Sequence, residues 1–301
     1  MRSKTQFTGT LKVSLLCLGF LVLFVLIFRS TISSFNSSKS NTRRASSATE
    51  EAQGREAESA TVVACPSVAP LTPTCSKAPP SLVNAVIHYA TTNITPQQTL
   101  QEISVSARVL QKKSPCNFLV FGLGHDSLMW TSLNYGGRTV FLEEDKAWID
   151  QIQQRIPGLE SYHVAYDTKV HQADDLIKIG MEEDECKKVS DPRFSKCQLA
   201  HKGFPSEVYD IEWDVIMVDA PTGYFEGAPG RMSAIYTAGL IARNKEQGET
   251  DVFVHDVDRK VEDTFSKAFL CQGYLREQQG RIRHFTIPSH KARLGRPFCP
   301  S

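Results

Sequence analysis

The sequence predicts an α/β fold: a mostly parallel, Rossmann-like sheet with an antiparallel hairpin at one edge, preceded by an N-terminal transmembrane helix. Between residues 78 and 301, short continuous apolar runs alternate with helix-forming stretches, as expected for strands buried on both faces. Aromatic and β-branched residues flank Gln279-Gly280, which is typical of a hairpin. Val13 to Phe28 is an apolar run without a charge.

The chain has 301 residues, of which 41% are hydrophobic, and a formal net charge of +1. This composition describes a globular protein and excludes wholesale disorder. A charge so close to zero argues against a protein that coats nucleic acid.

The first residues divide by composition into a cytoplasmic tail (1–12), a membrane anchor (13–28) and a disordered stem (29–77). Basic residues precede the apolar run and Arg29 closes it, which favours a cytoplasmic N-terminus and an exported C-terminus. A cleaved signal peptide is the alternative, but no small-residue cleavage site follows the run. The sequence therefore predicts a type II membrane protein that faces a secretory lumen.

Within the domain at 78–301, helices are expected at 82–89, 95–112, 127–134, 145–155, 171–181, 231–243 and 259–270. Thr95-Pro96 is a helix-start signal, Asp145 can cap a helix, and Pro157-Gly158 ends one. Strands are expected at 117–122, 138–145, 161–168, 213–221 and 251–256, with the hairpin at 274–287.

Seven cysteines follow the anchor and would face an oxidising compartment. Three pairs are close enough in sequence to join, namely Cys65 with Cys75, Cys186 with Cys197, and Cys271 with Cys299. Since seven is odd, at least one thiol stays free or pairs between chains.

The ends of the first two strands predict a nucleoside-bearing cofactor. Gly122 and Gly124 let the backbone bend and approach a ligand, and Glu143, about 20 residues later, can accept the hydroxyls of a ribose. No Walker A lysine follows the glycines, so phosphate binding is not indicated. S-adenosylmethionine therefore fits better than NAD, which is the alternative cofactor. The predicted edge hairpin agrees with this choice, because methyltransferase sheets of this type end in a reversed strand.

Asp219 ends the fourth strand, and His255-Asp256 ends the fifth. Asp219 and Asp256 could hold a divalent metal cation, and Asp219 or His255 could act as general base. His125, beside the glycines, is a further candidate base. The structural alternative is that Asp256 caps the next helix while His255 bonds to the backbone.

Tyr224 and Arg231 follow the fourth strand and should border the acceptor, since aromatic rings stack on sugars and arginine binds carboxylates. The basic C-terminal tail, with Arg293 and Arg296, could bind an acidic polymer. Without an RNA-binding motif, an acidic polysaccharide is expected rather than nucleic acid.

Several long blocks resemble the plant glucuronoxylan 4-O-methyltransferases, a polysaccharide-biosynthesis family that includes the irregular-xylem proteins. The blocks are SPCNFLVFGLGHDSLMW, GGRTVFLEEDKAWI, WDVIMVDAPTGY, APGRMSAIYTAGL, DVFVHDVDR and RHFTIPSHKARLGRPFC. The resemblance implies the methyltransferase fold, a Golgi type II protein, and methyl transfer from S-adenosylmethionine to O4 of glucuronic acid on xylan.

The same resemblance implies a divalent cation, places the cofactor at Gly122, Gly124 and Glu143, and suggests Golgi xylan-synthesis proteins as partners. Two alternatives stay open. One is an irregular-xylem-type protein needed for xylan chain growth, and the other is a non-catalytic xylan-binding scaffold.

Overall fold

The computed structural model describes residues 78–293 and 295–300. The predicted tail, anchor and stem lie outside these residues. Within the described part of the chain, no helix combines the length and the apolarity that a membrane span requires.

One seven-stranded sheet organises the domain, in the order β3-β2-β1-β4-β5-β7-β6. The strands β1 to β5 are parallel, β7 runs antiparallel to β5, and β6 is antiparallel to β7. This topology confirms the predicted Rossmann-like sheet with its antiparallel edge hairpin. The strands are β1 (Asn117–Phe121), β2 (Arg138–Glu143), β3 (Glu160–His163), β4 (Val215–Val218), β5 (Glu249–Val254), β6 (Leu275–Gln279) and β7 (Ile282–Pro288).

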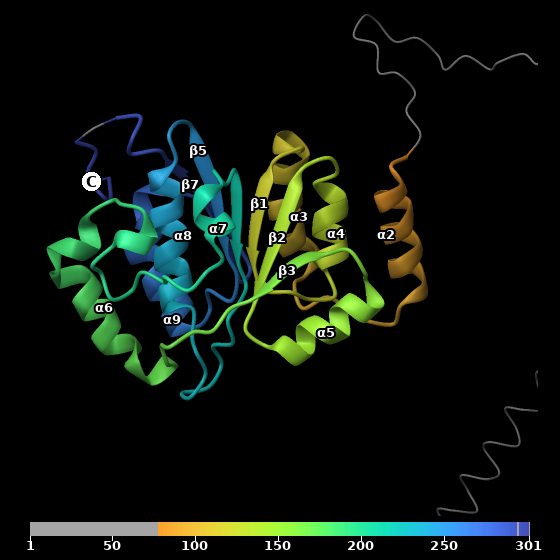
Figure 1. Cartoon of the computed structure of the whole chain (residues 1–301), viewed down its shortest axis with the longest axis horizontal. Coiled ribbons are helices and arrows are strands. Elements are labelled where there is room, and N and C mark those ends of the chain that lie inside the picture. The colour runs from red at the N-terminus through yellow and green to blue at the C-terminus, as the bar shows by residue number, and fades with distance from the viewer. Residues whose placement is uncertain (1–77, 294, 301) are drawn as a thin grey trace, which may run out of the picture. The chain divides into compact units, whose positions relative to one another are not determined.

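Helices cover both faces of the sheet (Figure 1). Side chains of α3, α4 and α5 pack into one core with β1 and β2, and those of α6, α8 and α9 pack into a second core on the opposite face. The helices are α2 (Pro80–Thr91), α3 (Leu100–Lys113), α4 (Ser127–Leu133), α5 (Lys146–Arg155), α6 (Ala173–Glu182), α7 (Ser206–Asp210), α8 (Met232–Asn244) and α9 (Lys260–Phe265).

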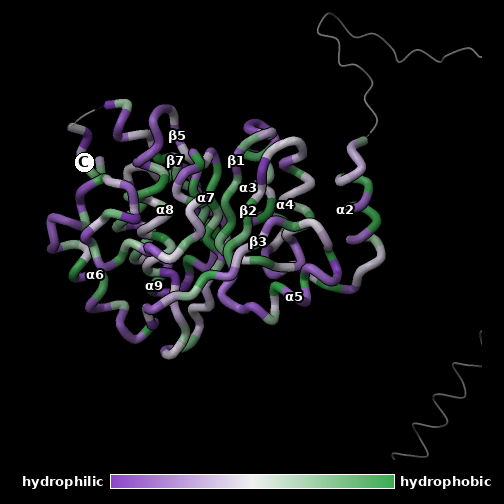
Figure 2. The backbone as a smooth tube through the Cα atoms, in the orientation of Figure 1, coloured by the Kyte–Doolittle hydropathy of each residue, from purple (hydrophilic) through white to green (hydrophobic). Residues whose placement is uncertain are grey.

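Hydropathy follows this layering, with the most apolar segments in the central strands (Figure 2). Four of the five residues of β1 and all four of β4 are buried. These are the short continuous apolar runs of the sequence, and their burial on both faces explains why they do not alternate with polar residues.

The start of α3 differs from the prediction and matters for the site. The helix begins at Leu100, because Thr99 and Glu102 form a reciprocal capping box, and Thr95 is not its cap. Residues 95–98 consequently stay outside the helix. The cap predicted at Asp145 is confirmed, since its carboxylate accepts from the amides of Ala147 (2.9 Å) and Trp148 (3.1 Å).

Two of the predicted disulfides are confirmed, Cys186–Cys197 and Cys271–Cys299. Cys116 is a buried free thiol. Cys65 and Cys75 lie outside the described residues, so their pairing stays a prediction.

Candidate active site

A cavity of about 420 Å³ opens where the parallel strands end. Its walls come from the segments that follow β1, β2, β4 and β5, and from the stretch just before α3. Ligands of open α/β sheets bind at this edge. The predicted site residues that line the cavity are Gly122, Gly124, His125, Glu143, Asp219, Tyr224, Arg231 and Asp256.

The two glycines leave room that a side chain would fill. Gly122 has a φ of +118°, which residues with a Cβ rarely adopt, and an added Cβ would lie 3.3 Å from Cβ of Ala220. A Cβ on Gly124 would lie 2.9 Å from Oδ1 of Asp126. The loop after β1 is therefore a close backbone approach of the kind that a cofactor tail needs.

Glu143 lies at the end of β2 and is only 7% exposed. Its carboxylate accepts from the amides of Leu123 and Asp145, each at 3.0 Å, which fixes the side chain at the cavity wall. Burial and the neighbouring Glu144 raise the pKa of Glu143 to about 7. Each carboxylate oxygen retains a lone pair for a ribose hydroxyl. Together, Glu143 and the glycine loop fit S-adenosylmethionine.

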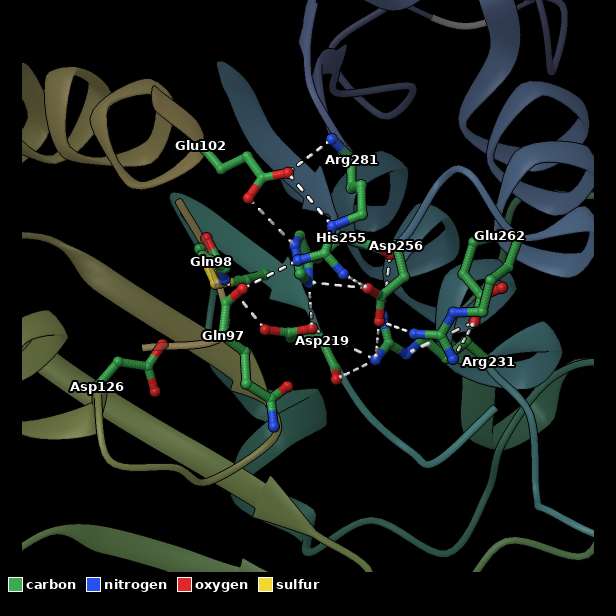
Figure 3. A network of polar contacts seen from close by, with 12 residues as sticks. Gln97, Gln98, Glu102, Asp126, Asp219, Arg231, His255, Asp256, Glu262 and Arg281 are labelled. Carbon is green, nitrogen blue, oxygen red and sulfur yellow. Dashed lines mark hydrogen bonds and ion pairs between the residues drawn. The ribbon is translucent and has the colours of Figure 1, made fainter. Parts of the chain in front are cut away.

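Asp219 is the acid at the end of β4 that faces the cavity, with 21% of its side chain exposed. Its Oδ1 lies 2.9 Å from Nδ1 of His255, and its Oδ2 accepts from the amide of Gln98 at 3.0 Å (Figure 3). Burial favours the neutral acid, but the hydrogen bond from His255 and the charge of Arg231 hold the pKa of Asp219 below its usual value. Asp219 is therefore ionised at neutral pH and able to accept a proton.

His255 lies behind Asp219, and only 1% of its side chain is exposed. Its Nε2 is buried without a hydrogen bond within the described residues, and it lies 3.8 Å from Oε2 of Glu102. This position corrects the prediction that His255 itself could take the substrate proton. The side chain orients Asp219, and its bond to that acid also overturns the alternative in which it bonds to the backbone.

Asp256 has a φ of +61°, an uncommon conformation for a residue with a side chain. It does not cap the helix that follows, because the cap of α9 is Arg259. Asp219, His255 and Asp256 each offer a ligand atom, and these atoms lie within 4.8 Å of one another. Two carboxylates and an imidazole are a donor set that divalent cations accept.

Three guanidinium groups contact Asp256, and those of Arg231 and Arg281 are labelled in Figure 3. Arg231 lies at 3.0 Å, Arg281 at 2.7 Å, and Arg259 makes a third ion pair. A cation could use these donor atoms only by taking the place of one or more of these arginines on Asp256.

Arg231 has a structural role that the sequence did not predict. It is buried, and it donates to the backbone carbonyls of His255 (2.9 Å), Pro221 (3.2 Å) and Asp219. The guanidinium thereby joins the segments that follow β4 and β5. These bonds use most of its donors within the fold, so binding of an acceptor carboxylate by Arg231 stays a prediction.

Tyr224 and His125 lie on two loops that line the cavity, those that follow the neighbouring strands β4 and β1. Tyr224 is 78% exposed, and its ring centroid is 5.1 Å from that of Phe225. His125 packs edge-on against Trp148 at 5.2 Å, and burial lowers its pKa. Tyr224 is free to stack on a sugar, whereas His125 is neutral at physiological pH.

Arg293 and Arg296 lie away from the cavity. Because β7 is antiparallel to β5, the chain leaves it at the amino edge of the parallel strands, where the amide of Ser289 donates to Gly248 at 2.8 Å. The disulfide Cys271–Cys299 ties the tail down there. The structure does not bring the two arginines to the site, so binding of the polymer by them stays a prediction about a separate surface.

Three residues that line the cavity were not predicted from the sequence as site residues, namely Gln98, Asp126 and Arg259. Asp126 directly follows the glycine loop, and burial together with the charge of Asp219 raises its pKa to about 6. Its position in FGLGHDS was a usable signal. No local signal placed Gln98, because it reaches Asp219 from a segment 121 residues away.

A family model described as IRX15/IRX15L/GXM matches residues 101–285, which include the glycine loop and the strand-end acids. The chain belongs to this family. The match covers most of the described domain and includes every residue that lines the cavity except those at 95–98.

Three relatives come from Arabidopsis thaliana. "Glucuronoxylan 4-O-methyltransferase 3" is 60% identical over 301 residues, covering 100% of this chain and 98% of that protein. "Glucuronoxylan 4-O-methyltransferase 1" is 68% identical over 75% of this chain and 82% of that protein. "Arabinogalactan O-methyltransferase 1" is 51% identical over 70% of this chain and 74% of that protein. Among solved structures, a methyltransferase-like protein of Silicibacter pomeroyi matches 65% of this chain and 89% of its own, at 18% identity and a TM-score of 0.36.

Proposed function

We propose that this protein transfers the methyl group of S-adenosylmethionine to O4 of glucuronic acid side chains of glucuronoxylan. The observation that carries the proposal is the 60% identity along the whole chain to a relative named as a glucuronoxylan 4-O-methyltransferase. The similarity to a named arabinogalactan O-methyltransferase is lower and covers less of the chain. This difference favours xylan as the acceptor.

When bound, S-adenosylmethionine supplies an electrophilic methyl group. The residues of this chain would bind and orient the reactants: the loop at Gly122 and Gly124 would hold the cofactor tail, and Glu143 would accept hydrogen bonds from its ribose. Asp219 takes the proton of the acceptor hydroxyl as the new bond forms. His255 and Gln98 hold the two oxygens of Asp219 in place.

A divalent cation at Asp219 and Asp256, with His255 as a third donor, is part of the proposal. Such an ion would polarise the acceptor hydroxyl and lower its pKa. We expect the full-length protein to bind Mn²⁺ in a calorimetric titration and Asp256→Asn to lose that binding. Unchanged binding in the variant would remove Asp256 from the ion site.

The proposed location is the Golgi membrane, with a single type II span at 13–28 and the domain in the lumen. The apolar run and its basic flank support this location. Protease protection of the domain in sealed Golgi vesicles is the test, and digestion without detergent would contradict the topology.

Methyl transfer tests the proposed activity. The full-length protein in detergent, given S-adenosylmethionine with a methyl label, should label glucuronoxylan and leave arabinogalactan unlabelled. Label on arabinogalactan alone would reassign the acceptor. Cofactor binding without transfer to either polymer would favour the scaffold or the chain-growth role.

A further inference from the structure

Arg259 is the cation at the cavity wall that the fold leaves available. Arg231 also lines the cavity, but three backbone carbonyls and two carboxylates occupy its donors. The Arg259 side chain is 25% exposed, and among the described residues it forms ion pairs only with Asp256 and, at 3.7 Å, with Glu262. A guanidinium has five N–H donors, so Arg259 has donors left for a ligand.

The negative charge around Arg259 is shared among several cations. Asp256 is contacted by Arg231 and Arg281 as well as by Arg259. Glu262 is fully buried, its oxygens lack hydrogen bonds within the described residues, and burial raises its pKa. Because Asp256 and Glu262 are each shared with Arg231, neither carboxylate is reserved for Arg259.

A uronate acceptor needs a cation in the same cavity as the base. In glucuronic acid the carboxylate is carried by C5, next to the C4 hydroxyl that reacts. Asp219 and Arg259 line the same cavity. Asp256 connects them, because it contacts Arg259 and lies 3.4 Å from His255, the partner of Asp219.

The aromatic loop lies next to the same guanidinium. A Cβ added to Gly223 would lie 3.2 Å from Nη1 of Arg259, and Gly223 immediately precedes the exposed Tyr224. Tyr224, Arg259 and Asp219 thus line one cavity, and Tyr224 is adjacent in the chain to a residue that lies beside the Arg259 guanidinium.

We infer that Arg259 binds the carboxylate of the glucuronic acid residue whose O4 is methylated, and so selects a uronate over a neutral sugar. This inference rests on the proposed function. A charge-assisted pair between a guanidinium and a carboxylate that is lost on truncation corresponds to roughly a 10- to 100-fold change in affinity.

The test compares two acceptors on the full-length protein: glucuronoxylan oligosaccharides, and the same oligosaccharides with the carboxyl group reduced to an alcohol. We expect Arg259→Ala to lower kcat/KM for the uronate by about 10- to 100-fold, mainly through KM, while kcat/KM for the reduced acceptor changes less than about twofold. Binding of S-adenosylmethionine, measured by calorimetry, should not change.

Arg281→Ala is the matched control, because it removes another ion pair to Asp256 without removing a residue that lines the cavity. It should retain the wild-type preference for the uronate. If Arg259→Ala does not fold, Arg259→Lys should still reduce the preference, since lysine cannot reproduce the planar fork.

An unchanged preference in a folded Arg259 variant, or an equal loss of preference in Arg281→Ala, would overturn the inference. Wild-type protein that binds the cofactor but methylates neither oligosaccharide would overturn the proposed function instead, and the inference with it.

Discussion

Two aspartate–histidine pairs lie at opposite edges of the same sheet. At the carboxyl edge, Asp219 and His255 are 2.9 Å apart, and at the amino edge Asp251 and His284 are 2.7 Å apart. Asp251 also binds Lys113 at 2.6 Å and accepts from Thr286 at 2.8 Å. Asp219 instead faces the cavity, and Nε2 of its histidine partner has no hydrogen bond within the described residues.

The comparison teaches that the surroundings, rather than the pair itself, decide the role. Asp251 is surrounded by partners, and its pKa is held at about 2 by His284 and Lys113 against the effect of burial. At the cavity, Asp126 and Glu143 have pKa values raised to about 6 and about 7. Acids at the amino edge stabilise the fold, whereas these two acids at the carboxyl edge cost stability, as is common at functional sites.

The largest expected effect separates the two pairs by activity. Asp219→Asn should lower kcat by about 10²- to 10⁴-fold, because the amide cannot accept the proton of the acceptor hydroxyl. The folded state and cofactor affinity should persist, since asparagine still has an oxygen for a hydrogen bond. Methyl transfer and thermal melting measure the two quantities, and activity near that of the wild type would remove Asp219 from the chemistry.

The second prediction concerns the pair at the amino edge, where a substitution should lower stability and leave activity unchanged. Asp251→Asn should reduce the free energy of unfolding by about 3–5 kcal/mol, because it leaves Lys113 and His284 partly unpaired, while kcat per folded molecule stays the same. The pKa of Asp251 is depressed, so its contribution is present above its ordinary pKa of 3.8 and is lost as the pH falls through about 2. Denaturant titrations should show the gap from the wild type closing over that window. A gap that does not depend on pH would contradict the ion-pair explanation.

The smallest effect concerns Glu143. Its pKa is raised, so its contribution to folding is fully present below about pH 4.5 and is lost as the pH rises through about 7. Without cofactor, Glu143→Gln should therefore be more stable than the wild type at pH 8, by up to about 3 kcal/mol, and equal to it near pH 4. Melting curves across this range provide the test. Lower stability of the variant at pH 8 would show that the ionised carboxylate supports the fold.

The sequence predicted those site features that depend on strand ends. Gly122, Glu143 and Asp219 were found because each follows a buried apolar run, and the carboxyl ends of parallel strands meet at one edge. The antiparallel hairpin was also predicted. The direction of its last strand already indicated where the C-terminal tail lies, but the prediction for the tail did not use it. A reversed β7 carries Arg293 and Arg296 to the amino edge, away from the cavity.

The features that were not predicted concern long side chains whose partners are distant in sequence. The guanidinium of Arg231 fits the backbone carbonyls that follow β4 and β5, and this fit exists only once the two strands pair. Gln98 was assigned to a helix because Thr95-Pro96 is a good start signal, but the capping box of Thr99 and Glu102 prevailed. Local patterns identify which strand ends carry chemistry, but they do not show which arginine remains free for a substrate.

The position of the transferred methyl group tests the central claim most directly. Full-length protein, S-adenosylmethionine with a ¹³C-labelled methyl group and glucuronoxylan should give one labelled product, whose NMR correlations place the methyl on O4 of glucuronic acid. Label on xylose or on another oxygen, or no label despite demonstrated cofactor binding, would contradict the account.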